Sequence, residues 1–311
     1  MSAATGTGRK VIRMANKIVN ITVLFVILLL LAFGCYTIWD SGQVYRAADA
    51  ARYEVYKPTA ENEGLSFEEL QAINPEVAAW LTVFGTHIDY PVVQGQDNLK
   101  YVNTNAKGEY SLTGAIFLDS KCATDFSGFV SILYGHHMER NTMFGEIGSF
   151  ADKDYFDARR YGMLYYDGQE HGIEFFAFAN ADAYSDLIFR TDITGQDERQ
   201  EYLDILKKAA FLIREDVKVS ADDRLILLST CSVSNTNGRD ILIGKITNDV
   251  YNDSFKTESV DKPAAIPVID AISGFFAEIP SAICFCIIAI LFLLILLTIA
   301  LLYKKKKYPR K

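Results

Sequence analysis

Two stretches of the chain are apolar at nearly every position. Residues 18–39 form the first, and residues 282–302, which contain no charged residue, form the second. Each is long enough to cross about 30 Å of hydrocarbon as a helix. The pattern therefore predicts two transmembrane helices, one over 18–39 and one over 280–303.

Basic residues lie outside both apolar runs, at the two ends of the chain. Residues 1–17 hold four of them, residues 304–311 hold six, and neither tail has an acidic residue. Positive flanks favour the cytoplasmic side, so we expect both termini inside the cell and residues 40–279 outside. A cleaved signal peptide could also explain the first run, and a wall-sorting signal the second. Both are disfavoured because no small-x-small site follows the first run and no LPXTG-like pentapeptide precedes the second.

The segment between the runs alternates short apolar stretches with turn residues. We expect strands at HIDYPVVQ, LTGAIFLD, GFVSILYG, RYGMLYYDG, GIEFFAFANA and RLILLSTC, with a hairpin turn at Asp167–Gly168. An amphipathic pattern predicts one helix over 198–216, and a helical stalk is expected around 44–55. Many strands with few helices indicate a mostly β fold, closed or nearly closed into a barrel.

Charge narrows the choice of partners. The chain has 31 basic and 39 acidic residues, and ten of the basic ones lie in the tails, so the middle portion carries a formal charge of −18. That sign makes a nucleic acid an unsuitable partner. Only Cys122 and Cys231 lie outside the apolar runs and their borders. The sequence leaves open whether these two cysteines form a disulfide. Cys122 is otherwise expected to be a buried or half-buried thiol. A structural zinc site is not expected.

Three residues stand at the ends of apolar runs, in positions that suit thiol chemistry. Cys231 closes the run RLILLSTC, His136 follows the glycine that ends GFVSILYG, and Arg239 follows an Asn-Gly turn. A nucleophilic thiol needs partial exposure and a cationic neighbour, and an arginine suits a developing oxyanion. Each residue also has an ordinary interpretation. Cys231 could be a small core residue, His136 a loop histidine, and Arg239 a solvated side chain at the start of an edge strand. His87 and His171 occur in turn-like contexts and are expected at the surface.

These residues resemble the signatures of sortases, the membrane-anchored cysteine transpeptidases of Gram-positive bacteria. YGHHM with TMFGEI, and LSTCS followed by Arg239, carry the resemblance, and INPEVAAWLTVFGTHIDYPVVQGQDN is similar to the start of a class B domain. The resemblance spans about residues 65–248. It implies an eight-stranded sortase barrel with peripheral helices, the predicted helix lying beside the groove.

The resemblance also implies roles for individual residues. Cys231 would attack a threonyl peptide bond in a sorting pentapeptide, His136 would protonate the leaving amine, and Arg239 would hold the oxyanion. An amine then resolves the thioacyl enzyme. Tyr134 and Ser229 match positions that line the substrate groove. No cofactor or metal is required, and the partners would be secreted surface proteins or pilins and an amine acceptor.

The second apolar run departs from the class B pattern. A C-terminal transmembrane segment is more typical of the pilin-polymerising class C enzymes, whose Asp-Pro-aromatic lid does not occur between residues 39 and 88. Wall anchoring and pilin joining therefore both remain open. So do two functions of other classes, a surface adhesin on a sortase-like barrel and a thiol peptidase without transferase activity.

The resemblance and the apolar runs together divide the chain. We expect a two-pass protein of the Gram-positive cell membrane with basic cytoplasmic tails at 1–17 and 304–311, membrane helices at 18–39 and 280–303, an extracytoplasmic stalk at 40–64, a catalytic barrel at 65–250 and a linker at 251–279.

Overall fold

A computed structural model describes residues 4–58, 65–231 and 237–255. Within these ranges nine strands form one sheet: β1 (Val77–Val83), β2 (Asp89–Val93), β3 (Ile116–Leu118), β4 (Val130–Tyr134), β5 (Tyr161–Tyr166), β6 (Gln169–Asp182), β7 (Ala210–Ile213), β8 (Arg224–Cys231) and β9 (Gly238–Thr247). The helices are α1 (Ala4–Ala48), α2 (Leu65–Ile73), α3 (Lys153–Ala158) and α4 (Gln196–Ala209), with short 3-10 helices η1 (Ala50–Tyr56), η2 (Lys100–Val102) and η3 (Ile147–Ala151).

The sheet closes on itself as a mixed barrel. Its strand order is β5-β1-β2-β3-β4-β8-β9-β6-β7, and β5 also pairs with β6, so eight strands form a ring and β7 attaches to β6 outside it. The pairs β2–β3 and β4–β8 are parallel, and the other pairs are antiparallel. The closed eight-stranded barrel expected from the sequence is confirmed.

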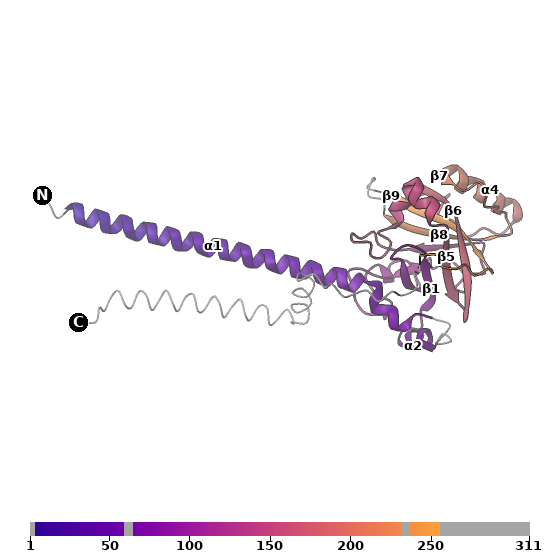
Figure 1. The fold of residues 1–311 in the computed structure, drawn as a ribbon, viewed down its shortest axis with the longest axis horizontal. Coiled ribbons are helices and arrows are strands. Elements are labelled where there is room, and N and C mark those ends of the chain that lie inside the picture. The colour runs from indigo at the N-terminus through magenta and orange to yellow at the C-terminus, as the bar shows by residue number, and fades with distance from the viewer. Residues whose placement is uncertain (1–3, 59–64, 232–236, 256–311) are drawn as a thin grey trace. The chain divides into compact units, whose positions relative to one another are not determined.

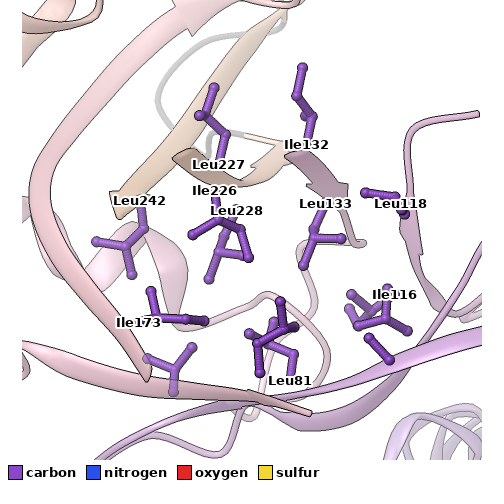
Figure 2. Close-up of a cluster of buried hydrophobic side chains, with 14 of the residues drawn as sticks. Leu81, Ile116, Leu118, Ile132, Leu133, Ile173, Ile226, Leu227, Leu228 and Leu242 are labelled. Atoms are coloured by element: carbon purple, nitrogen blue, oxygen red, sulfur yellow. The ribbon is translucent and has the colours of Figure 1, made fainter. Parts of the chain in front are cut away.

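The strands at the centre of the sheet are buried on both faces. Figure 2 shows Ile132 and Leu227 pointing to one side of the sheet, while Leu133 and Leu228 point to the other, toward Leu81. All five side chains have no exposed surface. Because both faces are covered, β4 and β8 appear in the sequence as continuous apolar runs instead of alternating ones.

The predicted helix over 198–216 ends earlier than its periodicity indicates. α4 stops at Ala209, and the next four residues form β7, which lies on β6 beside α4 (Figure 1). Phe211 packs edge-on against Phe178 of β6, with ring centroids 5.1 Å apart. Strand pairing therefore overrides the helical pattern over the last turns, and the predicted C-terminal part of the helix was wrong.

The turn between β5 and β6 agrees with its sequence signal. Asp167 and Gly168 both have positive φ, 51° and 74°. A two-residue hairpin turn with two left-handed residues matches the right-handed twist of the flanking strands. The hairpin predicted from Asp-Gly is confirmed.

The N-terminal helix α1 contains the first predicted membrane span. It is the one helix of the described residues that is long and apolar enough to cross a membrane. The expected stalk is helical, but it changes from α1 to η1 after Ala48. The chain divides into two units, residues 44–262 and the remaining terminal residues, and the site lies in the first. The second predicted span and most of the predicted linker lie outside the described residues and stay predictions.

Candidate active site

Two parallel strands end together at one end of the barrel. β4 pairs with β8 so that Tyr134 lies opposite Ser229, and the Gly135 N–H donates to the Ser229 carbonyl at 3.2 Å. His136 comes two residues after the end of β4, and Cys231 is the last residue of β8, so both follow this last pair closely. The parallel pairing of β4 with β8 thus brings together two strand ends that are almost a hundred residues apart in the sequence.

Gly135 is required for this close packing. A Cβ atom at this position would lie 2.5 Å from Cδ1 of Ile116 and 2.7 Å from the ring of Phe144. Real Cβ atoms do not approach other atoms so closely. The glycine therefore lets the chain leave β4 against the core and present His136 at the rim.

The ring of His136 is oriented by the backbone. Its Nε2 atom lies 2.9 Å from the carbonyl oxygen of Val102, at the end of η2, and the side chain is half-buried. A carbonyl oxygen only accepts hydrogen bonds, so Nε2 carries the hydrogen. Nδ1 is then the nitrogen left to exchange a proton with a substrate or a thiol.

Arg239 stands directly opposite Cys231 in the neighbouring strand. The β8–β9 register pairs these two residues across the hairpin, and residues 232–236 between them lie outside the described ranges. Directly opposed residues have Cβ atoms about 5 Å apart and on the same face. Arg239 is half-buried, and its Nη1 donates to the carbonyl of Gly238 at 3.3 Å. The backbone thus places a guanidinium beside the cysteine position.

An open groove of about 290 Å³ joins these elements. It contains four of the five predicted site residues, and the side chain of the fifth, Cys231, is not among those described. The residues that line it come from six segments: Asn98, Val102, Phe117, Tyr134, Gly135, His136, Ala183, Phe189, Ser229, Thr230 and Arg239. The hydroxyls of Ser229 and Thr230 are buried with no hydrogen-bond partner among the described residues. Buried polar groups are normally satisfied, so these two are suited to a ligand.

A buried carboxylate fixes the groove's polar wall. Asp119 accepts a hydrogen bond from Nδ2 of Asn98 at 2.7 Å and from the Tyr134 hydroxyl at 3.1 Å. The side-chain Oδ1 of Asn98 in turn accepts a hydrogen bond from the Ser120 N–H at 2.8 Å. Burial and, next, the charge of Asp119 raise the pKa of Tyr134, so its phenol stays neutral. Asn98, Asp119 and Thr230 stand within stretches singled out in the sequence, but none of the three was predicted as a site residue.

The remaining histidines and the second outer cysteine do not line the groove. His87 is largely exposed with Nδ1 3.2 Å from Glu146, and His171 stacks on Tyr166 with centroids 4.2 Å apart. His137 follows His136 but is absent from the groove lining. Cys122 is buried and free, so the disulfide to Cys231 left open by the sequence does not form in this structure. Among the described residues no group of His, Cys, Asp and Glu is arranged to hold a metal ion.

Cys122 is expected to resist alkylation in the folded protein. Burial raises the pKa of its thiol to about 11, so less than about one part in a thousand is thiolate at pH 7.5, and the thiolate is the reactive form. Iodoacetamide labelling at pH 7.5 followed by peptide mass spectrometry should leave Cys122 unmodified until the protein is unfolded. Labelling at the rate of an exposed thiol would contradict this.

Comparison with known proteins shows to which family the chain belongs. No protein-family model matches the chain. A curated relative, sortase B of Listeria monocytogenes, is 30% identical over 213 residues, which cover 68% of this chain and 84% of the relative. The chain belongs to the sortase B family. It is a cysteine transpeptidase, and the class B core predicted from its motifs is confirmed.

Two solved sortase B structures are more similar in sequence. Sortase B from the type II pilus of Streptococcus pneumoniae is 46% identical, with 59% of this chain and 99% of that chain covered and a TM-score of 0.52. A Streptococcus pyogenes class B sortase involved in pilus biogenesis is 40% identical, with the same two coverages and a TM-score of 0.54. In both cases the alignment covers almost the full length of the solved chain.

Proposed function

We propose that this sortase joins pilin subunits through a thioacyl intermediate on Cys231, with His136 and Arg239 as its catalytic partners. The observation that carries the proposal is the strand pairing at the groove. Cys231 and Arg239 are direct partners across β8 and β9, and β4 delivers His136 to the same end. A nucleophile, a proton carrier and an oxyanion donor are the groups that acyl transfer requires.

The reaction proceeds in two transfers. The Cys231 thiolate attacks the carbonyl carbon of a threonyl peptide bond, and the guanidinium of Arg239 stabilises the oxyanion of the tetrahedral intermediate. His136 gives a proton from Nδ1 to the leaving amine as the C–N bond breaks, which leaves a thioester. A second amine then attacks the thioester, gives its proton to His136 and releases Cys231 as thiolate.

The groove provides the contacts that hold the sorting peptide. Asn98 and Tyr134 are fixed by Asp119, and the hydroxyls of Ser229 and Thr230, which have no hydrogen-bond partner among the described residues, also line the groove. A peptide laid along the groove offers backbone groups for these side chains. Phe117 and Phe189 supply apolar surface for its side chains.

The choice of pilin joining over wall anchoring rests on the comparisons. The two pilus sortases are 46% and 40% identical to this chain, whereas the Listeria sortase B is 30% identical. The acceptor would then be a lysine amine of another pilin. We further propose that α1 anchors the enzyme in a Gram-positive membrane with the barrel outside, and that residues 280–303 form a second anchor.

The full-length enzyme in detergent micelles tests this function. It is incubated with a panel of threonine-containing sorting pentapeptides and, in parallel, with a pilin-derived lysine peptide, an oligoglycine or no amine. We expect one pentapeptide to be cleaved and its acyl part to appear on the lysine peptide. Transfer to oligoglycine alone would indicate wall anchoring. Hydrolysis unchanged by any amine would indicate a thiol peptidase.

A further inference from the structure

The loop that carries His136 has an unusual backbone. It runs from His136 to Gly145 between β4 and η3, and Arg140, Asn141 and Met143 have φ of 59°, 57° and 53°. Non-glycine residues rarely adopt this left-handed conformation and keep it only where surrounding contacts hold them. The Phe144 N–H donates to the His136 carbonyl at 3.1 Å, and Met143 forms a bridge with His137. The position of His136 therefore depends on how Met143 is held.

A buried tyrosine of β2 holds Met143. The hydroxyl oxygen of Tyr90 accepts a hydrogen bond from the Met143 N–H at 2.9 Å and donates its own hydrogen to the Ala48 carbonyl, also at 2.9 Å. A phenol has one hydrogen, so donation to Ala48 directs its lone pairs toward Met143. The side chain of Tyr90 is only 2% exposed, and water does not replace either bond readily.

The same loop meets the end of α1 at a second point. The Tyr45 hydroxyl donates to a carboxylate oxygen of Glu139 at 3.3 Å, and the guanidinium of Arg140 lies 4.3 Å from the centroid of the Tyr45 ring. Residues 45–48 thus contact the loop directly through Tyr45 and indirectly through Tyr90. These residues end the helix that contains the first apolar run.

We propose that Tyr90 is a positioning residue for the His136 loop, which its hydroxyl ties to the end of α1 through Ala48. The bond to Met143 keeps the His136 ring at the Val102 carbonyl and leaves Nδ1 for proton exchange. This inference rests on the proposed catalytic role of His136. Tyr90 touches neither substrate nor the reacting atoms.

Tyr90→Phe tests the inference in the full-length enzyme, because it removes one oxygen atom and keeps the buried ring. Tyr53→Phe is the matched control, since Tyr53 lines the same small cavity but its hydroxyl interacts with the Ala106 backbone. We expect Tyr90→Phe to lower kcat about tenfold with KM within about twofold, and amide hydrogen exchange in residues 138–145 to become about tenfold faster. Tyr53→Phe should change neither quantity.

The two readouts separate failure of this inference from failure of the proposed function. Unchanged exchange in the loop, or faster exchange with unchanged kcat, would overturn the positioning role of Tyr90. An equal loss of kcat in Tyr53→Phe would also overturn it, because the effect would then be general loosening of the core. Retention of activity by His136→Ala would instead overturn the catalytic assignment, while the exchange data would still report whether Tyr90 holds the loop.

Discussion

Replacing Cys231 with alanine is expected to lower kcat by at least about 10⁴-fold, because no other group can form the thioester. The change removes one sulfur atom at the last residue of β8 and leaves the backbone pairing with Arg239 available. The melting temperature should therefore stay close to that of the wild type. Turnover of a sorting pentapeptide, followed by separation of the products, measures the loss.

Cys122→Ala is the matched control for this variant. Cys122 is the other outer cysteine, and it is buried away from the groove lining. Its replacement should cost some stability through lost packing but leave kcat within about twofold. If Cys231→Ala kept more than about 1% of wild-type turnover, or if Cys122→Ala abolished it, the nucleophile assignment would be wrong.

Arg239→Lys and Arg239→Ala are both expected to lower turnover by at least about a hundredfold. Lysine keeps the charge but replaces a planar fork of donors with a single point charge, so it cannot place two hydrogen bonds on an oxyanion. Loss of one such donor costs on the order of 100- to 1000-fold in rate, about 3 to 4 kcal/mol. The effect should appear in kcat, with the melting temperature nearly unchanged.

Arg190→Lys is a control that makes the same chemical change next to another residue of the groove. Arg190 is half-buried beside the groove residue Phe189, and it pairs with Asp192 at 3.4 Å. A partly exposed ion pair of this kind contributes little to the free energy of folding, and Arg190 is not among the groove residues. We therefore expect the turnover of Arg190→Lys to stay within about twofold of the wild-type value. An Arg239→Lys enzyme with more than half of wild-type activity would leave Arg239 as an ordinary strand-end residue.

The sequence predicted most of the barrel because its strands carry local signals. The apolar runs around β4 and β8 end at polar residues, and the Asp167–Gly168 turn defines its hairpin by backbone geometry. β1 was not anticipated as a strand. Like β4 and β8 it is almost continuously buried and lacks a polar–apolar alternation, but it also contains Ala78 and Ala79, and alanine is depleted in strands. β7 was hidden for a different reason, because its residues continue the helical period of α4.

The sequence predicted only those residues of the candidate site that belong to recognisable motifs. His136, Cys231 and Arg239 combine a glycine, turn or strand-end signal with a side chain suited to thiol chemistry. Asp119 also ends a predicted strand, but neither it nor Asn98 has a residue type that this chemistry requires. Their place in the groove wall depends on the parallel pairing of β2 with β3 and on a hydrogen bond across 21 residues. The role inferred for Tyr90 is equally invisible in the sequence, since a tyrosine in a buried strand is ordinary.

A covalent intermediate on Cys231 is the most direct measure of the central claim. The full-length enzyme is mixed with the intact sorting pentapeptide that it cleaves, in the absence of any amine. The reaction is quenched in acid within the first turnover, and the enzyme is digested and analysed by mass spectrometry. We expect one acyl group per active enzyme, attached to the peptide that contains Cys231. This group should disappear when the lysine peptide is added before the quench. Cleavage of the pentapeptide with the acyl group on another residue, or with no acyl-enzyme at any time in the first turnover, would contradict the central claim.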